Sequence, residues 1–188
     1  MGVVAATDMV ATTGIHAGTR ALSFRTIYEH NAAFVWRILR RLGVKPADVE
    51  DVCQEVFLIV HRKLPEFQHR SAVQTWLYGI ALRCASGYRR RAAVAREVLG
   101  HVDDSVVGAV QVDSIENRQA RALLDRILDD LDEDKRAVFV LYELEEIGMA
   151  EVAAIIGCPL QTAYSRLHAA RAAVENATAR LRAKERRA

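Results

Sequence analysis

Apolar residues recur every three to four positions along most of the chain, which is the period of a helix with one buried face. No stretch of useful length shows the strict alternation of apolar and polar residues that marks a strand. We therefore expect an all-α protein. The pattern predicts helices over residues 24–42, 48–64, 71–95, 116–131 and 135–144, followed by two more helices from residue 148 onward.

The apolar residues of the first three predicted helices share one face of each helix, so they are the expected core. They are Ile27, Phe34, Val35, Ile38, Leu39 and Leu42, then Val49, Val52, Cys53, Val56, Phe57, Val60 and Leu64, then Trp76, Leu77, Ile80, Ala81 and Cys84.

The helical pattern is interrupted by the stretch EVLGHVDDSVVGAVQVDS, which mixes glycine with acidic residues and has no period. This composition predicts a flexible linker at 98–113 between two small helical domains, 22–97 and 114–180. Residues 1–21 have no clear period either, so a flexible N-terminal extension is expected there. Residues 181–188 form a basic tail.

The stretch GMAEVAAIIGCPLQTAYSRLHAAR has the pattern of a helix-turn-helix. A short apolar helix runs up to Gly157, a residue suited to the left-handed conformation that stops a helix. Pro159 then opens a second helix, whose buried stripe is narrow and contains small residues. The alternative is an ordinary helical hairpin with one solvated face.

The outward side of that second helix carries polar and basic residues that can bind base edges or phosphates in a DNA major groove. They are Gln161, Thr162, Ser165, Arg166, His168 and Arg171. Because this module serves repressors, activators, recombinases and polymerase subunits alike, it does not name a function by itself.

The predicted helix in DVEDVCQEVFLIVHRKL has an unusual outer face, where Asp51, Gln54, Glu55 and Leu58 lie at spacings of three and four. An exposed leucine framed by acids and an amide suggests a docking surface for another protein. The alternative is a solvated acidic face. General acid–base catalysis is not expected, because the carboxylates have no cleft and no accompanying nucleophile.

The stretch SAVQTWLYGIALRCASGYRRR places basic residues beside aromatic ones, a combination that suits melted or single-stranded DNA. Two alternatives remain open. Trp76 belongs to the core pattern, and the arginine run at 89–91 also complements a helix C-terminus.

The net charge is only +2, but basic clusters alternate with acidic ones along the chain. Three cysteines, Cys53, Cys84 and Cys158, are far apart, so reduced thiols are expected, with neither a metal site nor a cofactor. No apolar run approaches a membrane span, and the N-terminus makes a poor signal peptide. We therefore expect a cytoplasmic protein without membrane insertion.

Together, the two halves resemble bacterial sigma factors of the extracytoplasmic-function type, group IV of the sigma-70 family. DVEDVCQEVFLIVHRKL resembles region 2.2, TWLYGIALRCASGYRRR resembles regions 2.3 to 2.4, and LDEDKRAVFVLYELEEIGMAEVAAIIGCPLQTAYSRLHAAR resembles region 4. The three blocks occur in the family's order, and the resemblance covers about residues 27–174.

The resemblance implies that the protein binds core RNA polymerase and promoter DNA, catalyses no reaction, and is held inactive by an anti-sigma factor. Asp51, Gln54, Glu55 and Leu58 would dock on the β′ clamp helices, and the β flap would be a further polymerase contact. The −35 element would be recognised by Gln161, Thr162, Ser165, Arg166, His168 and Arg171. The −10 element would be bound by Gln68, His69, Arg70, Ser71, Trp76, Arg83, Tyr88, Arg89 and Arg90.

The chain also departs from the family pattern at several positions. Met149 stands where a Ser or Thr cap is usual, Tyr164 at a commonly basic position, and Gly79 and Arg83 where Arg and Asn are frequent. These changes affect the promoter sequence that is recognised. A stand-alone helix-turn-helix regulator is the alternative function, but it leaves the acidic helix face without a role. An adaptor that uses the acidic face alone leaves the basic surfaces unexplained.

Overall fold

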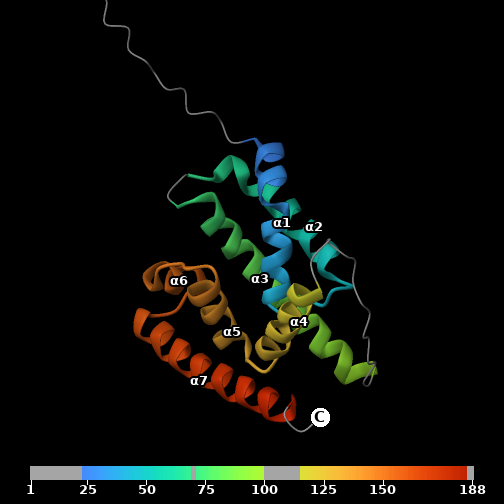
Figure 1. Ribbon diagram of the computed structural model, residues 1–188. Coiled ribbons are helices and arrows are strands. Elements are labelled where there is room, and N and C mark those ends of the chain that lie inside the picture. The colour runs from blue at the N-terminus through green and yellow to red at the C-terminus, as the bar shows by residue number, and fades with distance from the viewer. Residues whose placement is uncertain (1–22, 69–70, 100–114, 186–188) are drawn as a thin grey trace, which may run out of the picture.

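The computed structural model describes residues 23–68, 71–99 and 115–185, and every regular element within them is helical (Figure 1). The all-α prediction is therefore confirmed. The predicted extension at 1–21 and most of the predicted linker lie outside the described residues. The elements are α1 (Phe24–Arg41), α2 (Val49–Lys63), the 3₁₀ turn η1 (Leu64–Glu66), α3 (Val73–Leu99), α4 (Ile115–Asp129), α5 (Glu133–Phe139), the π-helical turn η2 (Val140–Leu144), α6 (Met149–Ile156) and α7 (Leu160–Glu185).

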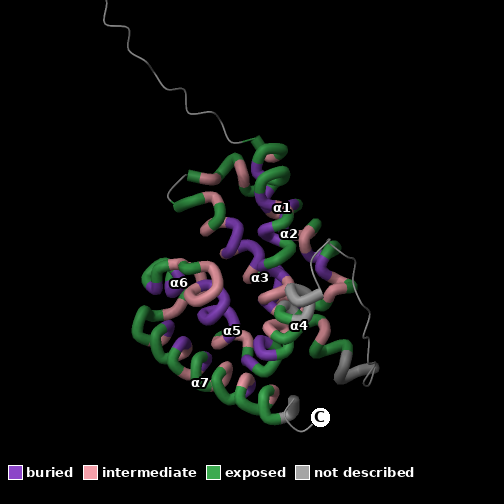
Figure 2. The backbone as a smooth tube through the Cα atoms, in the orientation of Figure 1, coloured by how far each residue is buried: buried purple, intermediate pink, exposed green. Residues whose placement is uncertain are grey.

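The first domain consists of α1, α2 and α3, each of which packs against the other two. Helix α1 begins where the Ser23 side chain accepts a hydrogen bond from the Thr26 amide at 3.1 Å. The apolar faces of the three helices then meet in the core. All six core positions predicted for α1 are buried, and Figure 2 shows the buried faces turned toward the middle of the domain.

The second domain consists of α4 to α7, with α4, α5 and α6 all in contact with α7. Asp132 caps α5 by accepting a hydrogen bond from the Lys135 amide at 2.9 Å. The helix predicted over 135–144 widens into η2 after Phe139. It ends at Leu144, Glu145 caps it, and the next residue, Glu146, is a non-glycine residue with φ of 55°. Such a left-handed residue terminates the helix and turns the chain sharply.

The helix-turn-helix has the predicted stop. Gly157 adopts φ of 75° and ψ of 40°, and its amide donates to the Ala153 carbonyl at 2.9 Å. The Pro159 carbonyl accepts the Ala163 amide at 3.0 Å at the start of α7. Ala163 and Ala170 are fully buried, so α6 and α7 cross closely. Helix α7 continues to Glu185, into the segment predicted as a tail.

Met149, which replaces the usual cap residue, is the first residue of α6 and is buried against the core. Gly148 occupies the cap position without a side-chain hydrogen bond. Its carbonyl accepts the amides of Glu151 at 2.9 Å and Val152 at 3.0 Å. The start of α6 is therefore held by backbone bonds and by apolar burial.

The left-handed stop at Gly157 can be tested against a glycine inside a helix. In Gly157→Ala, no described atom lies within 4 Å of the added Cβ, so the cost is conformational, about 1–2 kcal/mol. In Gly87→Ala, the Cβ meets only the Arg91 guanidinium at 3.5 Å, and helix stability should rise by about 0.5–1 kcal/mol. Thermal unfolding should therefore show a lower Tm for Gly157→Ala and a higher one for Gly87→Ala. A rise in both would contradict the left-handed stop.

Candidate nucleic-acid interface

The outer face of α2 is exposed as the spacing predicts. Asp51, Gln54 and Leu58 face solvent, and 58% of Leu58 is accessible. Glu55 is partly covered, because Arg91 Nη2 on α3 lies 3.2 Å from its Oε2. An ion pair this exposed contributes little to stability. The outer face of α2 therefore presents the exposed Leu58 between Asp51 and Gln54. The second acid of this face, Glu55, is paired with Arg91.

The loop before α3 is anchored by stacked aromatic rings. The ring centroids of Phe67 and Trp76 are 4.7 Å apart at an interplanar angle of 32°. Trp76 is half-buried and packs against the core, so it belongs to the core and to the loop at once. Gln68 and Ser71 are exposed beside this pair, whereas His69 and Arg70 lie outside the described residues.

The basic residues of α3 fall into two groups. Arg83 and Arg90 are exposed, while Arg89 is half-buried. Tyr88 is also half-buried, and its hydroxyl donates to Asp48 Oδ2 at 2.6 Å, which ties α3 to the start of α2. Arg83 and Arg90 are therefore the predicted α3 side chains that present their charge to solvent.

The first half of α7 presents the predicted polar surface. Gln161, Ser165, His168 and Arg171 are exposed, and Thr162 and Arg166 are half-buried. The six residues share the side of α7 opposite the buried stripe of Ala163, Leu167 and Ala170.

Two arginines of this surface form ion pairs with acidic residues of their own domain, and the sequence pattern did not predict these pairs. Arg166 forms an ion pair with Asp134 at the start of α5. Arg171 Nε donates to Glu143 Oε1 at 2.6 Å, and its guanidinium lies 5.9 Å from the centre of the Tyr142 ring. The helical period of α7 shows which of its side chains share a face, but it cannot show that Arg166 and Arg171 pair with acids on earlier helices.

Two exposed apolar residues of α7 were also missed. Leu160 is 47% accessible and Tyr164 is 48% accessible, one helical turn apart. They were detectable as apolar residues that fall outside the buried stripe. They add an apolar edge to the polar surface, which suits contact with the methyl group of thymine.

Among the described residues, no group of three or more His, Cys, Asp or Glu side chains could hold a metal ion. None of the described helices is long and apolar enough to cross a bilayer. The three cysteines are free thiols. Burial and, secondly, the charge of Glu50 raise the pKa of Cys53 to about 11. Burial and, secondly, Glu55 do the same for the pKa of Cys84, also to about 11.

The chain matches two family models in the order of its domains. Residues 27–94 match sigma-70 region 2, and residues 121–174 match sigma-70 region 4. The ECF RNA polymerase sigma-E factor of Escherichia coli K12 is 34% identical over 143 residues, which cover 71% of this chain and 75% of that protein. The sigma-E factor of Haemophilus influenzae is 34% identical over 139 residues, covering 69% of this chain and 74% of that protein.

Two solved structures share the fold. The sigma factor RpoE of Bartonella quintana, in complex with the anti-sigma factor NepR, superposes with a TM-score of 0.66 at 21% identity. That match covers 82% of this chain and 96% of the other. CnrH in complex with the cytosolic domain of CnrY gives a TM-score of 0.60 at 22% identity, over 81% of this chain and 85% of that one.

Alkylation rates test the state of the half-buried thiol of Cys53 and the buried thiol of Cys84. With a pKa of about 11 instead of 9, Cys53 and Cys84 hold far less thiolate at pH 8, so reaction with iodoacetamide should be about 100-fold slower than for an ordinary thiol. The rate should keep rising between pH 8 and pH 10. Mass spectrometry of each peptide measures it, with the urea-unfolded chain as control. Rates at pH 8 equal to those of the unfolded chain would contradict the burial.

Proposed function

The chain belongs to the extracytoplasmic-function (ECF) group of the sigma-70 family of RNA polymerase sigma factors, and we propose how its two domains divide the work of such a factor. The first domain docks on the core polymerase and binds the melted −10 element. The second domain binds the −35 element in the major groove. The observation that carries this division is that each domain has its own exposed polar surface, on α2 and α3 in one and on α7 in the other.

For polymerase docking, we assign the outer face of α2 to the clamp helices of the β′ subunit. Leu58 supports this assignment because it is an exposed apolar side chain, 58% accessible, on the same helix face as the polar residues Asp51 and Gln54. Asp51 and Gln54 form its polar surround, and Glu55 becomes available once Arg91 turns away. An apolar centre within a polar rim is the usual composition of a protein–protein interface.

For the −10 element, we assign the loop next to the Phe67–Trp76 stack to a base flipped out of the duplex. Gln68 and Ser71 supply polar groups at this loop, and Arg83 and Arg90 supply exposed charges for phosphates. His69, Arg70, Tyr88 and Arg89 complete the proposed set. Of these, Tyr88 would act through Asp48 and the position of α3 as much as by direct contact.

For the −35 element, the ion pair of Arg166 has to be exchanged for DNA. An exposed ion pair is worth about 0–1 kcal/mol, whereas a good bidentate contact to a base gives about 1–3 kcal/mol of discrimination against the wrong base. Exchanging the ion pair for a base contact therefore costs little and adds sequence preference. Asp134 keeps this guanidinium group near the surface of α7, and Glu143 does the same for Arg171. Gln161, Thr162, Ser165 and His168 complete the proposed contact surface.

We assign the second domain a further contact with the β flap of the polymerase. We also assign the whole chain an anti-sigma factor as its inhibitor. The solved complex of RpoE with NepR supports the second partner. We also assign the chain to the cytoplasm, where the polymerase works. The chain catalyses no reaction itself, and its contribution is promoter recognition and duplex opening.

The experiment that tests this function is transcription in vitro with sigma-free core polymerase on a promoter library. Specific starts should appear only when the chain is added, and their upstream sequences should share two elements. If starts are missing while the chain alone protects a DNA site, it acts as a stand-alone regulator and the assignment of α2 fails.

Docking is tested by Asp51→Ala combined with Leu58→Ala. Each side chain is exposed, so the fold should persist, while affinity for core polymerase should fall at least about tenfold because hot-spot truncations each cost above 1 kcal/mol. Glu29→Ala, an exposed acid on α1, is the matched control. Fluorescence anisotropy with labelled chain gives both affinities. Equal affinities for the double variant and the control would remove α2 from the interface.

Recognition of the −35 element is tested by Arg166→Ala with Arg180→Ala as its control. Both arginines lie on α7 and pair with an aspartate, Asp134 or Asp130. Arg166→Ala should weaken holoenzyme binding by about 1–3 kcal/mol if it contacts a guanine, and mainly at one base pair. Arg180→Ala should leave the base preference unchanged. Competition with single-base variants of the −35 element measures the difference, and an unchanged preference in Arg166→Ala would show that this residue contacts no base.

A further inference from the structure

Arg171 of α7 is held by two neighbouring residues of the turn η2. Its Nε donates to Glu143 Oε1 at 2.6 Å, and its guanidinium carbon lies 5.9 Å from the centre of the Tyr142 ring. A cation within about 6 Å of the centre of an aromatic ring is attracted to the face of that ring. The guanidinium therefore has one support at Nε and a second at its face.

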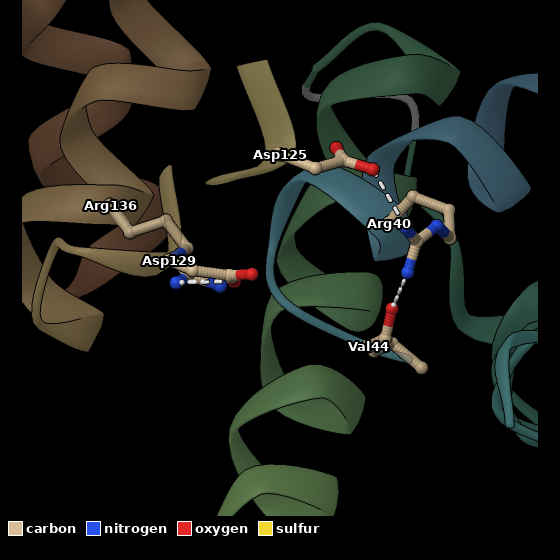
Figure 3. Close-up of polar contacts among 5 residues, drawn as sticks. All are labelled: Arg40, Val44, Asp125, Asp129 and Arg136. Carbon is tan, nitrogen blue, oxygen red and sulfur yellow. Dashed lines mark hydrogen bonds and ion pairs between the residues drawn. The ribbon is translucent and has the colours of Figure 1, made fainter. Parts of the chain in front are cut away.

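The nitrogen that Arg171 uses distinguishes it from the other paired arginines of the described residues. Arg40, for example, has both terminal nitrogens occupied, by the Asp125 carboxylate and the Val44 carbonyl, each at 2.6 Å (Figure 3). In Arg171, Nε forms the ion pair, and neither terminal nitrogen bonds a described residue. A terminal nitrogen forms the ion pairs of Arg37, Arg41, Arg91, Arg136, Arg166 and Arg180.

Arg171 stays accessible in spite of its two supports. Its side chain is 52% exposed, whereas that of Glu143 is 29% exposed. The two terminal nitrogens of an arginine form a planar fork that matches two oxygens of a phosphate. Because Glu143 bonds Nε, Arg171 can bind a phosphate through this fork without releasing its acid.

Arg166 has the opposite arrangement on the same helix. Its Nη2 pairs with Asp134, and 26% of its side chain is accessible. A DNA contact through both terminal nitrogens has to displace Asp134. One acid of the second domain therefore competes with DNA for its arginine, while Glu143 does not.

The turn η2 brings both supports to Arg171. The Glu145 amide donates to the Val140 carbonyl at 3.1 Å, and this bond between residues five apart closes a π-helical turn. Such turns are rare and often lie at functional sites. Adjacent residues of an α-helix do not face each other, yet Tyr142 and Glu143 contact one guanidinium. The irregular turn therefore shapes the polar surface of α7.

The position of Arg171 along α7 favours a phosphate over a base. It lies eleven residues after Leu160, the first residue of the helix, which is about 16 Å along the axis. The major groove is about 12 Å wide, and the N-terminal residues of a recognition helix contact the bases. When Gln161 and Ser165 reach base edges, Arg171 therefore lies at the sugar-phosphate backbone that borders the groove.

We propose that Glu143 and Tyr142 are positioning residues, which hold Arg171 so that its terminal nitrogens bind one DNA phosphate beside the −35 element. This inference rests on the proposed function of α7 as the helix that binds this element. An arginine that is already fixed loses less freedom when DNA binds. Ordering a mobile side chain at an interface lowers affinity by about two- to tenfold.

Nuclear magnetic resonance of the free, full-length chain tests the positioning without DNA. The order parameter of the Arg171 Nε–H group should approach that of rigid backbone, about 0.85. Arg182, an exposed arginine of α7 without an ion pair among the described residues, should fall below about 0.6. Glu143→Ala should lower the Arg171 value to that of Arg182, and Tyr142→Leu should lower it in part.

Equal order for the two arginines in the wild type would overturn the positioning, whatever α7 binds. An unchanged Arg171 value in Tyr142→Leu would remove the ring from the set and leave Glu143 as the positioning residue. Circular dichroism of each variant checks that the helix content is kept.

Two double-mutant cycles test the effect on promoter binding by the holoenzyme. Arg171→Ala should weaken binding about two- to tenfold more in the wild-type background than in Glu143→Ala. The cycle of Arg166 and Asp134 is the matched control and should have the opposite sign, because Asp134 competes with DNA. Each cycle cancels the direct effect of the acid's own charge on DNA. Glu143→Gln, which keeps an oxygen acceptor for Nε, should retain most of the coupling.

The sign of the first cycle decides the role of Glu143. If Arg171→Ala weakens binding equally in both backgrounds, or more in Glu143→Ala, then Glu143 does not position Arg171 for DNA. A coupling that is lost in Glu143→Gln as fully as in Glu143→Ala would show that the charge alone matters, and would overturn the positioning through Nε.

The kind of DNA contact follows from its dependence on sequence and salt. Arg171→Ala should weaken binding equally for all single-base variants of the −35 element and reduce the salt slope by about 0.9, the value for one phosphate. A loss at one base pair alone would overturn the phosphate contact. If the holoenzyme selected no −35 element, the proposed function and the phosphate contact would both fail. The order parameters would still decide whether Glu143 fixes Arg171.

Discussion

The arrangement of the two domains depends on the burial of one carboxylate. Glu145 can lie at 7% exposure only because Arg41, Tyr78 and Arg37 come to it from the other domain. A buried charge without such partners would be costly enough to exclude the arrangement. The same contact affects Tyr78, because burial and, secondly, the hydrogen bond to Glu145 raise the pKa of its hydroxyl. Glu145 caps η2, and the left-handed residue Glu146 turns the chain directly after it, which places the carboxylate at a corner of the second domain.

Local patterns in the sequence were sufficient to predict most of the helices and most of the exposed surfaces. The period of α1 identified its buried residues, Gly157 identified the stop of α6, and the spacing of Asp51, Gln54 and Leu58 identified an exposed face. Each of these rests on residues within a few positions of one another, where helical geometry alone decides which side chains share a face. The role of Trp76 could not be decided from the sequence, because its ring packs against the core and also against Phe67 of the loop.

Contacts between distant segments could not be predicted in this way. Arg40 and Asp125 are 85 positions apart, and Arg41 and Glu145 are 104 apart. In the sequence these residues look like ordinary solvated charges, since no local rule pairs them. The change from α-helix to the π-helical turn η2 was also not predicted, because the sequence of Val140–Leu144 fits a continuing α-helix equally well. The buried Arg136 is the clearest case, since a core arginine contradicts the usual preference for exposure.

Several acidic residues of this chain pair with arginines that lie on other helices. Asp134 and Glu143 hold arginines of α7, Glu55 holds Arg91 of α3, and Glu145 and Asp125 hold those of α1. The net charge of +2 is small because 26 basic residues are nearly balanced by 24 acidic ones, and the surface still carries many charges. Sequence-independent DNA affinity grows with the number of phosphates that are neutralised. Pairing of these arginines within the chain reduces the number of charges that are free to bind phosphates, while Arg83 and Arg90 remain exposed.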